Sequence, residues 1–206
     1  MAARYMFFVE GLDAIRSIED VPNDVLLAAR QAVNKTTDRA RASAAREIRR
    51  QVALPASYLG PNAGRLRVAK YATGRDLEGV VQGRQRPISL ARFARGSLTV
   101  GKTPPQGMRV EVKPGSARFM KGAFLMKLKA GSAALDTQFN LGLAVRTKDG
   151  RQPNKAYRPM PIGRGLWLLY GPSVDQVFRS VAQDIAPDQT DFLETEFLRL
   201  LETRRA

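Results

Sequence analysis

The sequence predicts an α+β fold with one long helix near the N-terminus, a run of short strands, and two helices at the C-terminus. Three observations lead to this prediction. A helical pattern runs from Asn23 to about Val52, the middle of the chain alternates short apolar runs with glycine and proline turns, and two shorter helical patterns end the chain. We therefore predict one domain over residues 1–206, with a protruding arm at 95–107 and a helical appendage at 188–206.

The long helix follows an opening strand at Arg4–Glu10, and it begins at Asn23, a residue type that caps helices well. Thirty residues would span roughly 45 Å. The apolar face is mostly alanine, which buries little area, so the helix needs a sheet along its side, a neighbouring subunit, or both. We predict that part of this face contacts a neighbouring copy, through Ala40, Ala44 and Ile48.

The central strands are predicted where apolar residues alternate or cluster between turn formers. They are expected at 65–72, 77–82, 88–93, 108–112, 122–128, 139–147 and 165–170. The segment around Pro114 and Gly115 reads as a turn, and the proline-rich residues 151–164 read as a loop. Ser173 is expected to cap a helix that Pro187 ends, and a last helix is expected from Thr190 to Arg204.

Cysteine and histidine are both absent, which excludes thiol nucleophiles, disulfides, the usual zinc sites and imidazole triads. No apolar run approaches the roughly twenty residues of a membrane-spanning helix. The apolar run near the N-terminus is interrupted by Glu10, so we predict neither a signal peptide nor a membrane partner.

The net charge is +15, and it is unevenly distributed. Residues 21–171 hold 28 basic and 8 acidic residues, whereas residues 1–20 and 172–206 hold more acidic than basic residues. A basic centre between acidic ends leaves two interpretations open. One is contact with nucleic acid, and the other is head-to-tail assembly of copies of the chain.

Two patterns that could carry chemistry do not support an enzyme. Residues 96–103 match the phosphate-loop pattern GxxxxGK[ST], but Pro104 and Pro105 follow where the helix of such a loop must begin, so we interpret the match as chance. Asp76 and Glu78 can share a strand face, where ion pairing to a nearby arginine such as Arg75 or Arg67 is favoured over catalysis. We predict no catalytic, cofactor-binding or metal site.

A nucleic-acid-binding accessory protein is the alternative function. Basic residues cluster in the sequence around Phe93, which could stack on a base. The candidate phosphate contacts are Arg84, Arg86, Arg92, Arg95 and Lys102. No helix-turn-helix or zinc-finger pattern accompanies them, and a solvated basic surface is the simpler interpretation.

Two short motifs stand out in the sequence. Ala32, Asn34, Lys35 and Thr36 fit an Ala-x-Asn-[Arg/Lys]-Thr entry into a long basic helix. The run from Tyr170 to Val174, with Phe178 after it, fits an apolar strand that ends in Tyr-Gly-Pro-Ser-Val and leads into a helix. With these motifs the chain resembles the minor tail protein Z family of long-tailed bacteriophages over roughly residues 20–185.

This resemblance implies a structural virion protein that completes the head-proximal end of the tail before head–tail joining, with the host cytoplasm as its place of assembly. It implies a long helix on a curved, mostly antiparallel sheet, and a homo-oligomeric ring, commonly of six subunits. The implied partners are a tail terminator or tail tube protein, the head–tail connector proteins and, in passing, genomic DNA. The arm at 95–107 would reach a neighbouring ring, and we predict Leu98 and Val100 as contacts.

Overall fold

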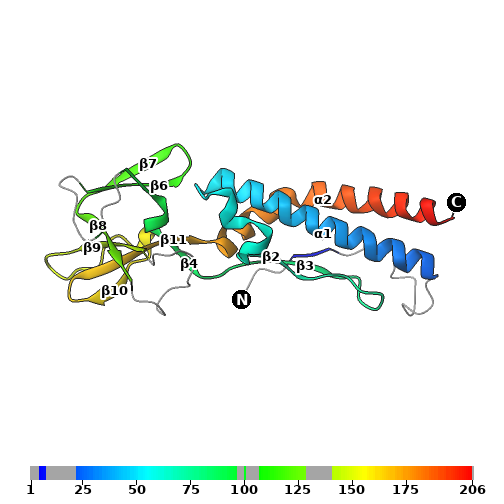
Figure 1. The fold of residues 1–206 in the computed structure, drawn as a ribbon, viewed down its shortest axis with the longest axis horizontal. Coiled ribbons are helices and arrows are strands. Elements are labelled where there is room, and N and C mark those ends of the chain that lie inside the picture. The colour runs from blue at the N-terminus through cyan, green and yellow to red at the C-terminus, as the bar shows by residue number, and fades with distance from the viewer. Residues whose placement is uncertain (1–4, 8–21, 97–99, 101–106, 129–140, 206) are drawn as a thin grey trace. The chain divides into compact units, whose positions relative to one another are not determined.

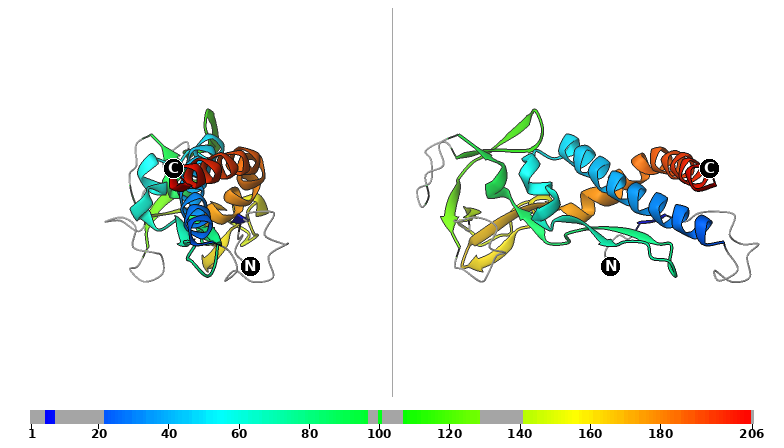
Figure 2. Two further views of the ribbon diagram at one scale, coloured as in Figure 1. Left: turned by 90° about the vertical axis from the view of Figure 1, so that its right-hand side faces the viewer. Right: turned by 45° about the vertical axis from the view of Figure 1, so that its right-hand side comes forward.

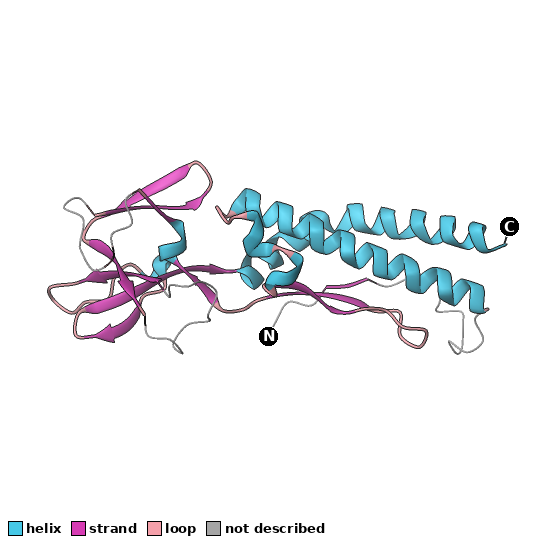
Figure 3. Cartoon of the chain, viewed as in Figure 1, coloured by secondary structure: helices cyan, strands magenta, loops and turns pink. Residues whose placement is uncertain are grey.

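The computed structural model describes residues 5–7, 22–96, 100, 107–128 and 141–205. The described chain is α+β, with two long helices and short strands in antiparallel sheets (Figure 3). It forms two compact units. The helical unit comprises residues 1–49, 55–85 and 174–206, and the β unit comprises residues 50–54 and 86–173.

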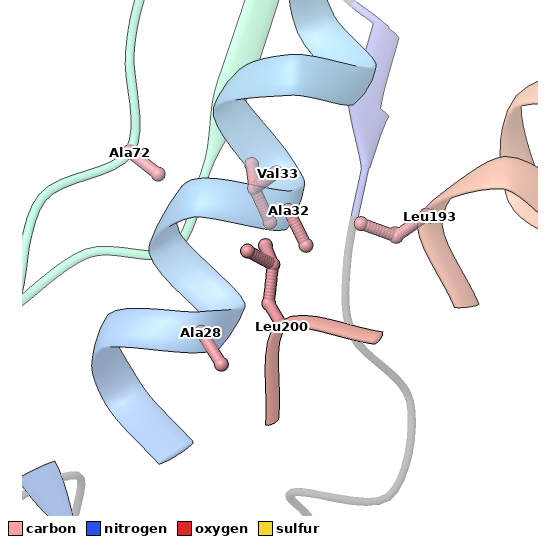
Figure 4. Packing of buried hydrophobic residues seen from close by; sticks show 6 residues of the cluster. All are labelled: Ala28, Ala32, Val33, Ala72, Leu193 and Leu200. Carbon is pink, nitrogen blue, oxygen red and sulfur yellow. The ribbon is translucent and has the colours of Figure 1, made fainter. Parts of the chain in front are cut away.

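The helical unit is built on two antiparallel helices, α1 (Asn23–Gln51) and α2 (Val174–Arg205), which lie side by side (Figures 1 and 2). The Arg39 guanidinium lies 4.3 Å from the ring centroid of Phe192 on α2. Small side chains on α1 let the leucines of α2 approach closely. Figure 4 shows the resulting apolar cluster, formed by Ala28, Ala32, Val33, Ala72, Leu193 and Leu200.

A three-stranded sheet of order β1–β3–β2 lies along α1 (Figure 1). Its strands are β1 (Tyr5–Phe7), β2 (Leu66–Lys70) and β3 (Gly79–Gly83). Both ends of β3 are glycines because the helices come close there. A β-carbon at Gly79 would lie 2.0 Å from Thr37 Oγ1 on α1, and one at Gly83 would lie 2.8 Å from the Asp175 Cα on α2.

The β unit contains two antiparallel sheets. In the first, the order is β10–β11–β9–β8, and β4 also pairs with β11. In the second, the order is β5–β6–β7. The strands of the first sheet are β4 (Pro87–Ser89), β8 (Ala123–Lys127), β9 (Leu141–Arg146), β10 (Met160–Gly163) and β11 (Leu166–Ser173). Those of the second are β5 (Ala94–Arg95), β6 (Met108–Lys113) and β7 (Ser116–Met120).

Four short 3-10 helices complete the described secondary structure, at Ala56–Leu59, Pro61–Ala63, Leu90–Phe93 and Lys155–Tyr157. The helix Leu90–Phe93 falls where the sequence predicted the second half of a strand. Ser89 begins it, and its hydroxyl accepts a hydrogen bond from the Ala91 amide at 3.3 Å. A local side-chain bond of this kind competes with strand pairing and ends β4 early.

The two predicted C-terminal helices are one helix, because Pro187 lies inside α2 without ending it. Proline removes the hydrogen bond to the carbonyl four residues earlier, here that of Gln183. Gln183 and Pro187 are both exposed, so this carbonyl lies on the solvent side of the helix. Buried residues on either side, Val181 and Leu193, anchor both halves of the helix. The predicted appendage at 188–206 is therefore the C-terminal half of α2.

Three strands were missing from the sequence prediction, and one of them is the two-residue β5, which pairs with β6. β7 follows the Pro114–Gly115 turn, and the predicted turn over 113–121 is a hairpin that pairs β7 with β6. β10 lies in the predicted loop 151–164 and pairs with β11. All four β10 residues are exposed, and Pro161 lies within this strand at the edge of the sheet, where proline is tolerated.

Candidate functional surfaces

The predicted subunit contacts on α1 are buried by the chain itself. Ala40 is 3% exposed, and Ala44 and Ile48 are fully buried. These three side chains therefore belong to the packed interior of a single copy, and the contact between copies that we propose below uses other residues. Leu98 lies outside the described residues. Val100 is half-buried and forms an isolated parallel bridge with Leu125.

The predicted phosphate contacts do not form one cluster in a single unit. Arg84 belongs to the helical unit, whereas Arg86, Arg92 and Arg95 belong to the β unit, and Lys102 lies outside the described residues. Arg84 and Arg92 are half-buried. The exposed Arg95 is paired with Glu111, at 3.0 Å between Nε and Oε2.

Phe93 is fully buried, which corrects the prediction that its ring could stack on a base. It ends the 3-10 helix Leu90–Phe93, and its ring approaches the backbone of β11 at Gly171, where a β-carbon would lie 3.4 Å from the ring. Phe93 therefore belongs to the core of the β unit. Most of the phosphate-loop match at 96–103 lies outside the described residues.

The carboxylates Asp76 and Glu78 are ion-paired, as predicted, but their partner is Lys70 rather than an arginine. Lys70 Nζ lies 2.5 Å from Asp76 Oδ2 and also contacts Glu78. These hydrogen bonds raise the pKa of Lys70 and lower that of Asp76. In the described part of the chain, no three acidic side chains gather in a group that could hold a metal ion.

The first motif, in α1, joins three parts of the helical unit. Asn34 makes two hydrogen bonds with the backbone of Ala72. Its Nδ2 donates to the Ala72 carbonyl at 3.2 Å, and its Oδ1 accepts from the Ala72 amide at 2.7 Å. Lys35 donates to Glu196 on α2 at 2.6 Å, and Arg199 donates to the same carboxylate at 2.7 Å. These two hydrogen bonds lower the Glu196 pKa to about 2.

The second motif lies where β11 ends and α2 begins. Tyr170 pairs with Ser89 of β4, and burial raises the pKa of its hydroxyl. Ser173 is buried at the last position of β11, and α2 starts at the next residue. The buried Asp175 accepts two hydrogen bonds from Arg179, at 2.9 and 3.1 Å, in the first turn of α2. The motif therefore marks the change from strand to helix along the chain.

The outer side of α2 carries an acidic face that the sequence analysis did not isolate. At 100° per residue, Asp184, Asp188, Asp191 and Glu202 lie within roughly 60° of one another, and all four are exposed. Leu198 lies among them and is 49% exposed. Among the described residues these carboxylates have no ion-pair partner. The expected break at Pro187 concealed this face, because it divided one helix into two.

The two units carry very different net charges. The helical unit holds 17 basic and 16 acidic residues, a net charge of +1. The β unit holds 17 basic residues and only three acidic ones, Glu111, Asp136 and Asp149, a net charge of +14. The sequence division at residues 21 and 171 mixed the two units, so it did not reveal this contrast.

The β5–β6–β7 sheet presents a second exposed group that the sequence analysis missed. Arg95 pairs with Arg109, and Arg109 pairs with Phe119, so the three side chains form a row across one face. Phe119 is 54% exposed. The sequence feature that could have revealed this group is the alternation of the apolar Met108 and Val110 with Arg109 on β6, which is typical of a strand with one wet face.

Comparisons with protein-family models, with curated proteins and with solved structures found no match. In the described part of the chain, neither long helix combines the length and apolar character needed to cross a membrane.

Proposed function

We propose that this chain is a structural virion protein that completes the head-proximal end of a phage tail and prepares it for joining to a head. It would act as a homo-oligomeric ring, of six subunits on the family pattern, stacked on a tail terminator or tail tube protein and facing the head–tail connector. Its work is assembly in the host cytoplasm, and it carries out no covalent chemistry.

The two motifs shared with the minor tail protein Z family support this proposal through their places in the fold. Asn34 and Lys35 tie α1 to the loop after β2 and to α2. The run from Tyr170 to Val174 spans the end of β11 and the start of α2. The first motif therefore makes part-buried hydrogen bonds within the helical unit, and the second spans the change from strand to helix.

The separation of charge between the two units is the observation that carries the proposal of a ring. The outer face of α2 presents four exposed carboxylates, and the β unit has a net charge of +14. Complementary surfaces on different parts of one molecule favour head-to-tail contacts, and such contacts close into rings when the rotation permits. We infer that α2 of one copy contacts the β unit of the next.

This contact predicts an oligomer that depends on salt and on the α2 carboxylates. The double variant Asp188→Asn/Asp191→Asn should shift the protein toward monomer, and rising salt should do the same to the wild type, because exposed charges are screened. Native mass spectrometry and light scattering over a concentration series measure both effects.

The matched control is Asp24→Asn/Asp149→Asn, which makes the same change of net charge at the start of α1 and in the turn after β9. It should assemble like the wild type. A wild-type protein that stays monomeric at every concentration, or a control that loses assembly equally, would contradict the head-to-tail contact.

The tail-completion role is tested separately in the virus that encodes the chain. Inactivating the gene should leave filled heads and tails unjoined in electron micrographs, and the wild-type gene supplied in trans should restore joined particles. Joined particles in normal numbers without the gene would reject the role.

A further inference from the structure

Strands β5 and β6 have one buried face and one exposed face, and β7 is exposed from Ser116 to Phe119. Ala94, Met108 and Val110 point to the buried side, and each is at most 8% exposed. Their neighbours along the strands point the other way. The register places Arg95, Arg109 and Phe119 side by side on that exposed face, across about 10 Å at the usual strand spacing.

The charge of this sheet is mostly positive. Its three strands carry four basic residues, Arg95, Arg109, Lys113 and Arg118, and one acidic residue, Glu111. Glu111 lies on the same sheet and is already bound, since its carboxylate accepts hydrogen bonds from the Gly115 amide at 2.9 Å and from Arg95 at 3.0 Å. The exposed Lys121 follows Phe119 by two residues, and the exposed Arg118 pairs with Val110 on the opposite face. Such a surface suits a polyanion.

We propose that the exposed face of the β5–β6–β7 sheet binds single-stranded nucleic acid, with Phe119 stacking on a base and Arg109 contacting the backbone phosphates. This activity goes beyond the proposed assembly role and does not depend on it. An aromatic ring on a sheet face among arginines provides both parts of single-strand recognition, a stacking platform and a positive track.

The exposed ring distinguishes this ligand from other polyanions. Bases in a duplex are stacked on one another, so Phe119 would contribute nothing to duplex binding, and an acidic peptide or lipid surface presents no base to stack on. Phe119 is 54% exposed, on the face that also carries Arg95 and Arg109. A ring held in this setting gains most from an unpaired base.

The experiment measures binding of the full chain to a fluorescently labelled oligothymidylate by anisotropy, over a series of salt concentrations. Phe119→Ala should lower affinity by about tenfold and leave the salt dependence unchanged. Arg109→Gln should weaken binding severalfold and reduce the slope of log affinity against log salt by about 0.7.

Matched variants separate the site from general effects. Phe119→Tyr should retain affinity and Phe119→Leu should lose it, because stacking requires an aromatic ring rather than apolar area. Leu198→Ala, which truncates an equally exposed side chain on α2, should have no effect. Arg164→Gln makes the same charge change in the turn between β10 and β11 and should cost much less than Arg109→Gln.

Three outcomes would overturn the proposal: equal affinity for duplex and single strand with no effect of Phe119→Ala, equal losses from Arg164→Gln and Arg109→Gln, or tighter binding to vesicles containing phosphatidylserine than to the oligonucleotide. Oligonucleotide binding is tested independently of ring assembly. Asp188→Asn/Asp191→Asn should change assembly while leaving oligonucleotide affinity intact, so the two proposals can fail separately.

Discussion

The helical unit and the β unit contain the same number of cationic side chains, 17 each, but 16 and three acidic side chains respectively. The difference in net charge, +1 against +14, therefore comes from where the acids are, and not from where the arginines and lysines are. Equal numbers of cations are used in two different ways, and the contacts of individual residues show how.

Cations of the helical unit are used largely to hold the fold together. Arg65 is 9% exposed, lies 4.1 Å from the ring centroid of Tyr58, and donates to the Tyr58 carbonyl at 3.2 Å. Arg41 donates to the carbonyls of Leu59 and Leu66, at 2.5 and 3.1 Å. Guanidinium groups suit this task, because several donors on one plane can satisfy carbonyls of an irregular loop.

Fewer ion pairs are open to the cations of the β unit. Three acids cannot neutralise 17 cations, and one of the three, Glu111, is bound to Arg95. Unneutralised surface charge of one sign opposes folding through self-repulsion, and either of the two contacts proposed above, with α2 of another copy or with nucleic acid, would reduce it. We therefore expect the cations of the helical unit to stabilise the fold and those of the β unit to contact a partner.

The largest predicted effect comes from making the same substitution in each unit. Arg65→Ala removes a buried hydrogen bond and a cation–π contact and leaves a cavity, so it should destabilise the protein by about 2–4 kcal/mol. Arg164→Ala, in an exposed turn of the β unit, should change stability by no more than about 0.5 kcal/mol. Urea unfolding followed by circular dichroism compares them. Similar losses of unfolding free energy in the two variants would contradict this difference between the cations of the two units.

A smaller effect is expected at Glu196, whose pKa of about 2 in the folded chain lies below its ordinary value of 4.5. A lowered folded-state pKa stabilises the fold above the unfolded-state value, and this stabilisation is lost as the pH falls from about 4.5 toward 2. Its partners are half-exposed, so we expect about 1–2 kcal/mol. Glu196→Gln should be less stable at pH 7 and should lose less stability between pH 5 and 2 than the wild type.

The smallest stability change should follow Glu111→Gln in the β unit. Its pair with Arg95 is solvent-exposed, so the urea midpoint should stay close to that of the wild type. Removing the one carboxylate of this sheet should at the same time strengthen oligonucleotide binding severalfold, because the surface becomes more positive. Weaker binding would show that Glu111 positions Arg95 for the ligand instead of opposing it.

The elements that the sequence predicted well are those with a strong period and no special turn chemistry. α1 was expected from Asn23 to about Val52 and runs from Asn23 to Gln51. Its long alanine face identified a buried surface, but not what covers it. The leucines of α2 that fill it, Leu193 and Leu200, lie more than 150 residues away, and no local pattern connects them to α1.

The elements that the sequence did not predict depend on tertiary context. Pro187 breaks most helices, but here its exposed position lets α2 continue. β7 and β10 follow or contain turn formers, and they exist because β6 and β11 offer them partners. The candidate surfaces also depend on tertiary context. The row from Arg95 to Phe119 depends on strand register, which composition does not encode.

Residue-resolved arginine modification with phenylglyoxal, read by mass spectrometry, tests the two uses of cations most directly. We predict slow modification at Arg41 and Arg65 of the helical unit and fast modification at Arg109, Arg118 and Arg164 of the β unit. Added oligothymidylate should protect Arg109 and leave Arg164 unchanged. Equal modification rates in the two units, without selective protection of Arg109, would contradict this difference between their cations.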